Sequence, residues 1–294
     1  MHRTYYAADR ITAAVRTATD DVRSGRLPWI SFKAPKSWSQ MAGGAGDAWA
    51  RDLADGLATV PGPVWLAIHH EPEKDGDMTQ WTAMQARIAP IIHARSDNVA
   101  YTVIYSGWNT FGGGKNTLAS KWPGDANVDV TAIDAYNDYG VVRGGKEGAN
   151  QLDIRAYYLK LSAWAQAHGT AWGIAEMGQS IKGAKDDPTW LTRAYDDMRS
   201  LGGAALSYFD NNENSVTDWR LNDSVKVQQY KCGFPPQSQR ICRPGSRRRR
   251  WSPVSPARCV VDFGQRSAPA ERTTHAAHPA TRRGARCGTA TTRT

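Results

Sequence analysis

Six nearly uninterrupted apolar runs recur in the first 210 residues and constrain the fold more than any other feature. They are LPWISFK (27–33), PVWLAIHH (63–70), NVAYTVIYS (98–106), VDVTAIDAY (128–136), TAWGIAEM (170–177) and GGAALSYFD (202–210). Runs that are apolar at almost every position are typical of parallel strands buried on both faces of a sheet. The stretches between them have helical spacing, and we expect helices near 46–59, 78–94, 151–168 and 188–200, with Gly169 as a C-cap of the third.

The distance between successive runs narrows the architecture. Most strand starts are about 30 to 40 residues apart, which is the size of a βα unit in a (β/α)8 barrel or in a doubly wound sheet. No GxGxxG follows the first run, and we interpret Gly112 to Gly114 as a flexible loop, so nucleotide binding has little support. A weak seventh strand is expected at HRTYY (2–6). A closed eight-stranded barrel would need one more strand at the front.

Charge divides the chain into two parts. Residues 235–294 hold 13 Arg, no Lys and two acidic residues, whereas residues 1–234 hold 24 basic and 26 acidic residues. We therefore predict a folded domain over 1–234 and a disordered Arg- and Pro-rich tail over 235–294. The abrupt switch to a Lys-free composition favours a frame-shifted or unrelated reading of the coding sequence over a selected basic tail.

The nearly neutral body disfavours a specific nucleic-acid partner, which would require clustered Lys and Arg on the folded domain. No stretch reaches the roughly 18 to 20 uninterrupted apolar residues of a membrane-spanning helix. The first residues, MHRTYYAADR, lack the pattern of a secretory signal. Tryptophan is abundant, at 12 residues, and the composition is compatible either with core packing or with stacking of aromatic rings on sugars.

Glutamates follow two of the predicted strands. The second run leads into His69, His70 and Glu71, and the fifth run leads into Glu176. The two glutamates are 105 residues apart, or three units of 35, which predicts strands three apart whose ends face one another across a barrel mouth. Paired carboxyl groups across a cleft are the equipment of a glycoside hydrolase, with one as proton donor and the other as nucleophile or base.

These segments resemble a known family. LAIHHEPEKDGDMTQW and the later WGIAEMG are similar to the acid/base and nucleophile segments of family 26 glycoside hydrolases, which belong to a clan of retaining (β/α)8 glycosidases. ISFKAP (30–35), VDVTAIDAYN (128–137) and AALSYFD (204–210) resemble strands three, six and eight of that family, so the resemblance covers roughly 2–230. It implies a (β/α)8 TIM barrel that lacks its first strand and helix.

Roles follow from the resemblance residue by residue. Glu71 corresponds to the acid/base and Glu176 to the nucleophile of a retaining, endo-acting β-glycoside hydrolase. His70 resembles the family's His before the acid, and Tyr136 resembles the Tyr that hydrogen-bonds the nucleophile. The resemblance also implies a polysaccharide or oligosaccharide substrate and secretion, although this chain shows no signal peptide.

Two departures concern the substrate. Mannan-cleaving members have Arg three residues before the His, where this sequence has Ala67, and a Trp shortly after the Glu, where residues 72–77 contain no aromatic residue. The catalytic pair is intact, but a mannan substrate is not supported by these positions. Further residues expected at the mouth, and assigned to substrate binding with His69, His70 and Tyr136, are Trp38, Tyr105, Trp108, Asp134 and Asp210, with Asn109 and Asn211 beside them. Trp38 and Trp108 are expected in polar loops and favour sugar stacking, whereas Asp210 could equally cap a helix.

Three other hypotheses remain. His69, His70, Glu71 and Glu73 could be metal ligands, but adjacent strand residues point to opposite sides, HExxH is absent, and we predict neither a metal nor a cofactor. A catalytically impaired carbohydrate-binding barrel would fit a missing front end, although both glutamates are kept. A basic interaction protein rests only on the tail. Oligomeric state cannot be read from the sequence.

Overall fold

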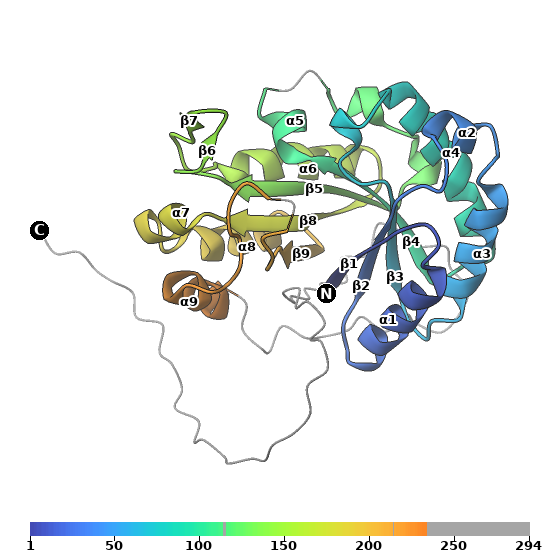
Figure 1. Cartoon of the computed structure of the whole chain (residues 1–294), viewed down its shortest axis with the longest axis horizontal. Helices are drawn as coiled ribbons and strands as arrows, with labels where there is room; N and C mark the ends of the chain where they lie inside the picture. Colours follow the sequence, from blue (N-terminus) through green and yellow to red (C-terminus); the bar gives the residue numbers. More distant parts are fainter. Residues whose placement is uncertain (114–115, 214, 234–294) are drawn as a thin grey trace, which may run out of the picture.

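The computed structural model describes residues 1–113, 116–213 and 215–233, and the predicted disordered tail lies outside them. Seven parallel strands form one curved sheet in the order β1-β2-β3-β4-β5-β8-β9, with helices on its convex face (Figure 1). The strands are β1 (His2–Tyr6), β2 (Pro28–Phe32), β3 (Val64–Ile68), β4 (Val99–Ser106), β5 (Val130–Asn137), β8 (Ala171–Gln179) and β9 (Ala205–Tyr208). This is a nearly closed barrel, and the predicted barrel fold and the weak strand at 2–6 are confirmed.

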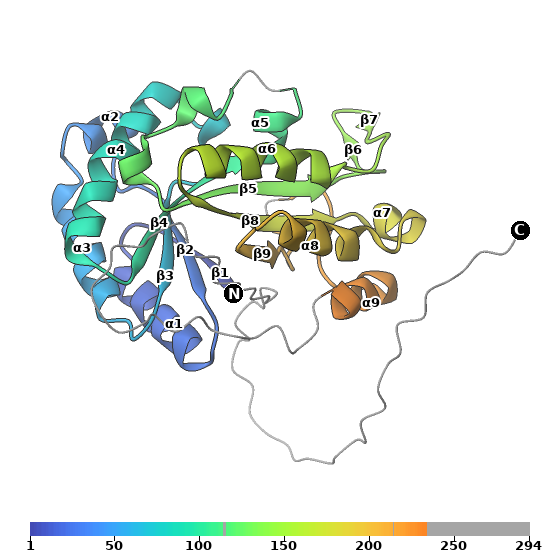
Figure 2. The ribbon, with the colours of Figure 1, turned by 180° about the vertical axis from the view of Figure 1, so that it is seen from behind.

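Helices connect successive strands on the outside of the barrel, as the view from behind shows (Figure 2). The longer ones are α1 (Ile11–Arg23), α3 (Asp47–Ala58), α4 (Met78–Arg95), α6 (Ile154–Ala167), α8 (Trp190–Ser200) and α9 (Ser224–Gly233). Short elements lie between them: α2 (Trp38–Ala42), α5 (Gly107–Phe111), α7 (Ile181–Asp186), the 3₁₀ turns η1 (Pro72–Lys74), η2 (Ala119–Lys121) and η3 (Asp125–Asn127), and the hairpin of β6 (Val142–Arg143) and β7 (Lys146–Glu147). No helix within the described residues is long and apolar enough to cross a membrane.

Local sequence explains where these elements begin and end. The Asp153 side chain accepts a hydrogen bond from the backbone N–H of Ala156 and starts α6, and Gly169 follows its end at φ 65°, as predicted for a C-cap. Trp38 and Trp108 were expected in loops, and this was wrong, because Trp38 begins the short helix α2 and Trp108 is the second residue of the short helix α5. The Ser37 side chain and Gln40 form a capping box that initiates α2. Gly112 ends α5, whereas Gly114 lies outside the described residues.

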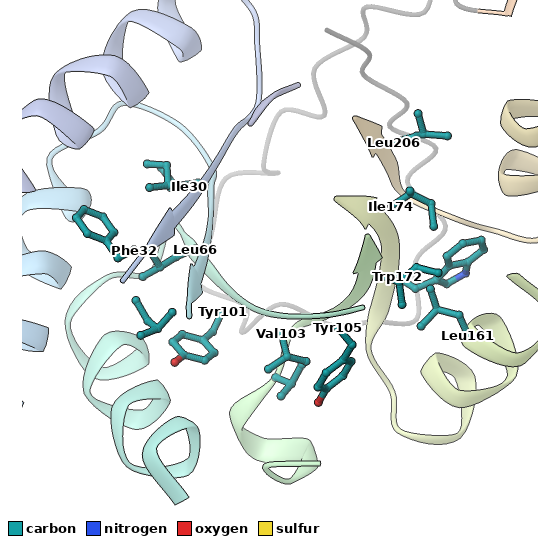
Figure 3. Packing of buried hydrophobic residues seen from close by; sticks show 14 of the residues in the cluster. Ile30, Phe32, Leu66, Tyr101, Val103, Tyr105, Leu161, Trp172, Ile174 and Leu206 are labelled. Atoms are coloured by element: carbon teal, nitrogen blue, oxygen red, sulfur yellow. The ribbon is translucent and has the colours of Figure 1, made fainter. Parts of the chain in front are cut away.

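The sheet has an apolar layer on each face. Outside the barrel, large side chains point from the strands toward the helices, as Figure 3 shows for Phe32, Tyr105 and Trp172. Inside, small residues such as Ala100 and Ala132 face the ring pair Trp29 and Trp65, whose centroids are 4.8 Å apart. The two indoles thereby fill the barrel interior, and the Trp29 ring N–H donates to Thr102 Oγ1. The barrel is therefore a packed core with an open mouth at the strand ends.

Two strands of the sheet have a free edge. Within the described residues β1 and β9 each pair on one side only. In β1, the His2 N–H donates to the Leu27 carbonyl and the Tyr6 carbonyl accepts from Lys33, so both residues direct backbone groups toward β2. Backbone groups alternate in direction along a strand, so those of Arg3 and Tyr5 face the side of β1 away from β2. Edge strands that pair with a neighbouring strand on one side only are templates for pairing with another chain.

We therefore expect the protein to self-associate as its concentration rises. Sedimentation velocity over a hundredfold concentration range should show a sedimentation coefficient that increases with concentration. A monomer at every concentration, with a single cooperative melting transition, would contradict this expectation and would mean that another element covers the edges.

Candidate active site

A β-bulge in β8 places Glu176 in the mouth of the barrel. Ile133 of β5 pairs with Ile174, but the next residue, Asp134, pairs with Glu176, so Ala175 is one extra residue in β8. Ile174 and Met177 pack in the outer core, whereas Ala175 lies in the inner one. Regular alternation would turn residue 176 to the same side as Ile174, and the extra residue turns it inward instead.

Two phenols hold the Glu176 carboxylate. Tyr5 donates to its Oε1 at 2.6 Å and Tyr136 donates to its Oε2 at 2.5 Å. The buried guanidinium of Arg3 has Nη2 at 3.8 Å from Oε1. These donors and the positive charge stabilise the ionised carboxylate and fix its orientation. The Tyr136 ring packs against Trp219 at a centroid distance of 4.8 Å, which limits its rotation.

Glu71 lies across the mouth in a different environment. It follows β3 in a left-handed backbone conformation, with φ 48° and ψ 54°, and its N–H donates to the carbonyl of Ile104 in β4. A non-glycine residue in this region is uncommon, and such strain is concentrated at functional sites. Burial of the carboxyl group raises the Glu71 pKa to about 8, and the negative charges of Glu176 and Glu73 act in the same direction. A hydrogen bond with the Ser106 side chain and the charge of Arg3 act in the opposite direction.

The strands that carry the two glutamates are separated as the sequence predicted. Two strands, β4 and β5, lie between β3 and β8 in the sheet, so the glutamates follow strands that are three apart. The mutual influence of their charges on the Glu71 pKa places the two carboxyl groups in one cluster. The Glu176 carboxyl group accepts hydrogen bonds from two phenols, whereas burial drives the Glu71 carboxyl group toward its protonated form.

Asp134 is a third acidic group in this cluster. It is 2% exposed, and neither of its carboxyl oxygens has a hydrogen-bond partner. Burial raises its pKa well above the usual value, and the charges of Glu176 and Glu71 raise it further. Burial and the neighbouring negative charges therefore favour the protonated form of Asp134 over the ionised one.

The two histidines point in different directions, as expected of adjacent residues. His69 accepts from the Trp38 indole N–H at 3.2 Å and contacts Asp75 at 2.8 Å through its Nε2 atom, whereas His70 has Nε2 at 3.9 Å from Glu176. Burial lowers the pKa of His70 well below its usual value, so its imidazole is neutral at pH 7. Its buried Nδ1 has no partner. His70 thus lines the mouth, and His69 fixes the loop beside it.

The proposed metal set of His69, His70, Glu71 and Glu73 is not brought together. The structure instead places potential ligand atoms of His70, Asp134 and Glu176 within 4.8 Å of one another. An imidazole and two carboxylates could bind a divalent cation. The oxygens of Glu176 already accept from two phenols, however, and Arg3 adds a positive charge beside them. The surroundings of Glu176 are therefore better suited to holding its carboxylate in place than to binding a cation.

Three further residues that were predicted to bind substrate differ in their exposure and their contacts. Trp108, on α5 directly after β4, is 67% exposed and available to a ligand. Trp38 is 8% exposed and contacts His69, so it supports the mouth from behind. Asp210 accepts from the backbone N–H of Leu221 and fixes the loop after β9.

Tyr105 is not at the mouth. Its side chain is completely buried on the helix side of β4, and its hydroxyl donates to the carbonyl of Lys121 (Figure 3). The expectation of a substrate-binding Tyr105 was wrong because the alternation of β4 directs residue 105 outward while Ile104 faces the interior.

Sequence reasoning missed four residues of the site: Arg3, Tyr5, Glu73 and Trp219. Arg3 and Tyr5 lie on the weak strand at 2–6, whose alternation could have indicated two inward-facing polar side chains. Trp219 comes from the loop after β9, far from any strand end. No local pattern in the sequence marks it.

No family model matches the chain. Endoglucanase H of Acetivibrio thermocellus is 27% identical over 200 residues, or 63% of this chain, and the chain spans about a fifth (21%) of that protein. A GH26 β-mannanase from Bacteroides ovatus has a TM-score of 0.53 at 16% identity, covering 79% of this chain and 77% of its own. The fold is the (β/α) barrel that this solved glycoside hydrolase has.

Other solved structures share this barrel. An endo-β-1,4-mannanase from Cellulomonas fimi, solved as a double mutant, has a TM-score of 0.57 at 16% identity and covers 77% of this chain and 58% of its own. Cel5A of Thermotoga maritima, solved with mannotriose, has a TM-score of 0.55 at 13% identity and covers 74% of each chain. The likeness concerns the fold, so the chemistry must be argued from the site itself.

The raised Glu71 pKa predicts a pH-dependent gain of stability in Glu71→Gln. Between pH 4.5 and about 8 the folded state holds a proton on Glu71 that the unfolded state releases, so this group destabilises the protein increasingly as pH rises. Gln removes that effect. We expect Glu71→Gln to exceed the wild type by on the order of 5 kcal/mol in unfolding free energy at pH 9, with little difference at pH 4.

Urea titrations at the two pH values provide the measurement. Glu147→Gln is the matched control, because Glu147 is exposed on β7 and should show no such gain. An equal difference between Glu71→Gln and wild type at both pH values would contradict the assigned protonation.

Proposed function

We propose that the chain is a retaining, endo-acting β-glycoside hydrolase, with Glu71 as acid/base and Glu176 as nucleophile. The observation that carries the proposal is the contrast between the two carboxyl groups. Glu176 accepts from two phenols beside Arg3, while Glu71 is driven toward its protonated form by burial and by its acidic neighbours. Carboxyl groups whose environments separate their protonation states are the arrangement that glycoside hydrolysis requires.

In the first step Glu71 donates its proton to the glycosidic oxygen while a Glu176 oxygen attacks the anomeric carbon. The bond to the leaving sugar breaks, the leaving sugar departs as an alcohol, and a glycosyl ester forms on Glu176. In the second step the Glu71 carboxylate takes a proton from water, whose oxygen attacks the same carbon. The Glu176 carboxylate is released, and the product keeps its anomeric configuration.

Other residues of the mouth would position the substrate. Tyr5 and Tyr136 orient the Glu176 oxygens, and neutral His70 has its Nε2 atom 3.9 Å from the same carboxylate. The exposed Trp108 ring offers a stacking face for a sugar away from the cleavage point, which suits a polysaccharide chain that extends beyond the site. Secretion, implied by the family resemblance, belongs to the same proposal.

The substrate is a plant- or microbial-type polysaccharide. The named similar proteins include β-mannanases and an endoglucanase, but Ala67 and residues 72–77 depart from the pattern of mannan-cleaving members. A panel of β-mannan, β-1,3-xylan and mixed-linkage β-glucan, assayed for reducing ends, distinguishes these polysaccharides.

The two glutamates should fail in different ways when they are replaced. Glu71→Ala should retain the first step on an activated aryl glycoside, because a good leaving group needs little protonation, and azide should restore turnover of the glycosyl-enzyme. Glu176→Ala should lose turnover on every substrate, since no covalent intermediate can form. Steady-state rates with and without azide provide the measurement.

Equal losses in both variants, with no azide rescue, would contradict the assigned roles. A wild-type protein that binds oligosaccharide but releases no sugar would favour the carbohydrate-binding barrel instead.

Trp108→Ala tests the stacking surface. We expect KM for a polysaccharide to rise by about fivefold with kcat nearly unchanged, because a stacked ring contributes on the order of 1 kcal/mol to binding. Leu159→Ala, at another exposed apolar residue (49% exposed) on α6, is the matched control and should leave both constants unchanged. An unchanged KM in Trp108→Ala would exclude the ring from the substrate site.

A further inference from the structure

A buried ion pair lies behind Glu71, outside the residues that would touch the substrate. Lys121 Nζ donates to Glu73 Oε1 at 2.8 Å and to Thr110 Oγ1 at 2.7 Å. The two charged side chains are 0% and 1% exposed. Burial of two charges is costly and does not by itself stabilise a fold, so their presence calls for another explanation.

The pair joins three segments around Glu71. Glu73 belongs to η1, which begins directly after Glu71, and its Oε1 also accepts the backbone N–H of Ser106 at the end of β4. Thr110 lies on α5 and Lys121 on η2. The Lys121 ammonium lies 4.5 Å from the centroid of the Tyr105 ring, and the Tyr105 hydroxyl donates to the Lys121 carbonyl. We name Glu73, Tyr105, Ser106, Thr110 and Lys121 the Glu73 brace.

The brace acts on a backbone that would not hold its conformation alone. Glu71 and His69 both have positive φ, at 48° and 55°, and η1 is only three residues long. The Glu71 N–H donates to the Ile104 carbonyl and fixes the backbone at residue 71. Two residues later, the Glu73 side chain accepts from the Ser106 N–H and fixes the chain there. Ser106 is shared, since its N–H bonds to Glu73 and its side chain bonds to Glu71.

Resting on the proposed function, we propose that Glu73 is a positioning residue, which uses the brace to hold the Glu71 carboxyl where it delivers its proton to the glycosidic oxygen. Glu73 itself touches no substrate, because its carboxylate is buried behind η1 and bonded to Lys121. The role accounts for a charged pair in the core and for the outward direction of Tyr105.

The same residue affects protonation of Glu71. The titratable and charged groups that act on Glu71 are Glu176 on β8, Glu73 on η1, Asp134 on β5 and Arg3 on β1. Glu73 is one of the charges that raise the Glu71 pKa, so its neutralisation lowers that pKa. A general acid works only while protonated, and the alkaline limb of the pH–rate profile should then move to lower pH.

Two variants of Glu73 test the positioning role. Glu73→Ala removes the brace, and we expect kcat/KM on unactivated oligosaccharides to fall about 100-fold, because small misplacement of a catalytic group costs that much. On activated aryl glycosides the fall should stay below about tenfold, since protonation matters little there. Glu73→Gln keeps the shape, and should show a smaller loss with the alkaline limb moved to lower pH.

Asp21→Asn is the matched control. Asp21 is also an acidic residue, 1% exposed and paired with a cation, Arg26, but it lies on α1 and contacts His2 at the start of β1, the opposite end of the strands. The Asp21→Asn variant should have a lower melting temperature, and any change in its kcat/KM should be the same for unactivated oligosaccharides and for activated aryl glycosides. Equal losses on both substrate types in Glu73→Ala, with an unmoved alkaline limb in Glu73→Gln, would overturn the positioning role.

Direct titration of Glu71 separates this inference from the proposed function. Carboxyl carbon NMR of the full-length wild type and of Glu73→Gln should show a lower Glu71 pKa in the variant, whether or not the protein cleaves the sugars offered. An unchanged Glu71 titration would overturn the inference even in an active enzyme. If the protein hydrolyses none of the sugars but the Glu71 pKa is lower in Glu73→Gln, the proposed function would be contradicted and the effect of Glu73 on Glu71 would still be supported.

Discussion

The bulge at Ala175 is the constraint on which the site depends. It reverses the alternation of β8 for one step and turns Glu176 from the helix layer into the mouth. Its neighbours are then forced to be polar: Tyr5 and Tyr136 donate to the carboxylate, and Arg3 lies beside it. A carboxylate taken into a barrel mouth without such donors would be too costly to keep ionised.

Burial acts on the other acidic groups of the mouth. It raises the pKa of Glu71 and of Asp134, and the charge of Glu176 raises both further. Glu176 differs from them in its two phenol donors and its neighbouring guanidinium. A proton donor and a nucleophile arise from the same residue type, because one is surrounded by hydrogen-bond donors and the other by a dry surface and like charges.

The sequence predicted what is local and periodic. The six apolar runs and the weak strand at 2–6 together predicted the seven parallel strands. The strand ends predicted that Glu71, His70, Tyr136 and Glu176 would approach one another. The direction of Tyr105 was misjudged because the side that a residue faces depends on strand register and not on its distance from the strand end. Trp219 and the Glu73–Lys121 pair could not be predicted, since they depend on loops that meet only in three dimensions. The helices that contain Trp38 and Trp108 have only five residues each, which is too short for a helical spacing of apolar residues to be recognised in the sequence.

Trapping of the covalent intermediate tests the central claim most directly. Manno- and gluco-configured dinitrophenyl 2-deoxy-2-fluoro-β-glycosides form the glycosyl-enzyme but hydrolyse it slowly, and peptide mass spectrometry then identifies the labelled residue. The account predicts a single sugar on Glu176, with the label absent from the Glu176→Ala variant. A label on Glu71, or inactivation without a label on Glu176, would contradict it.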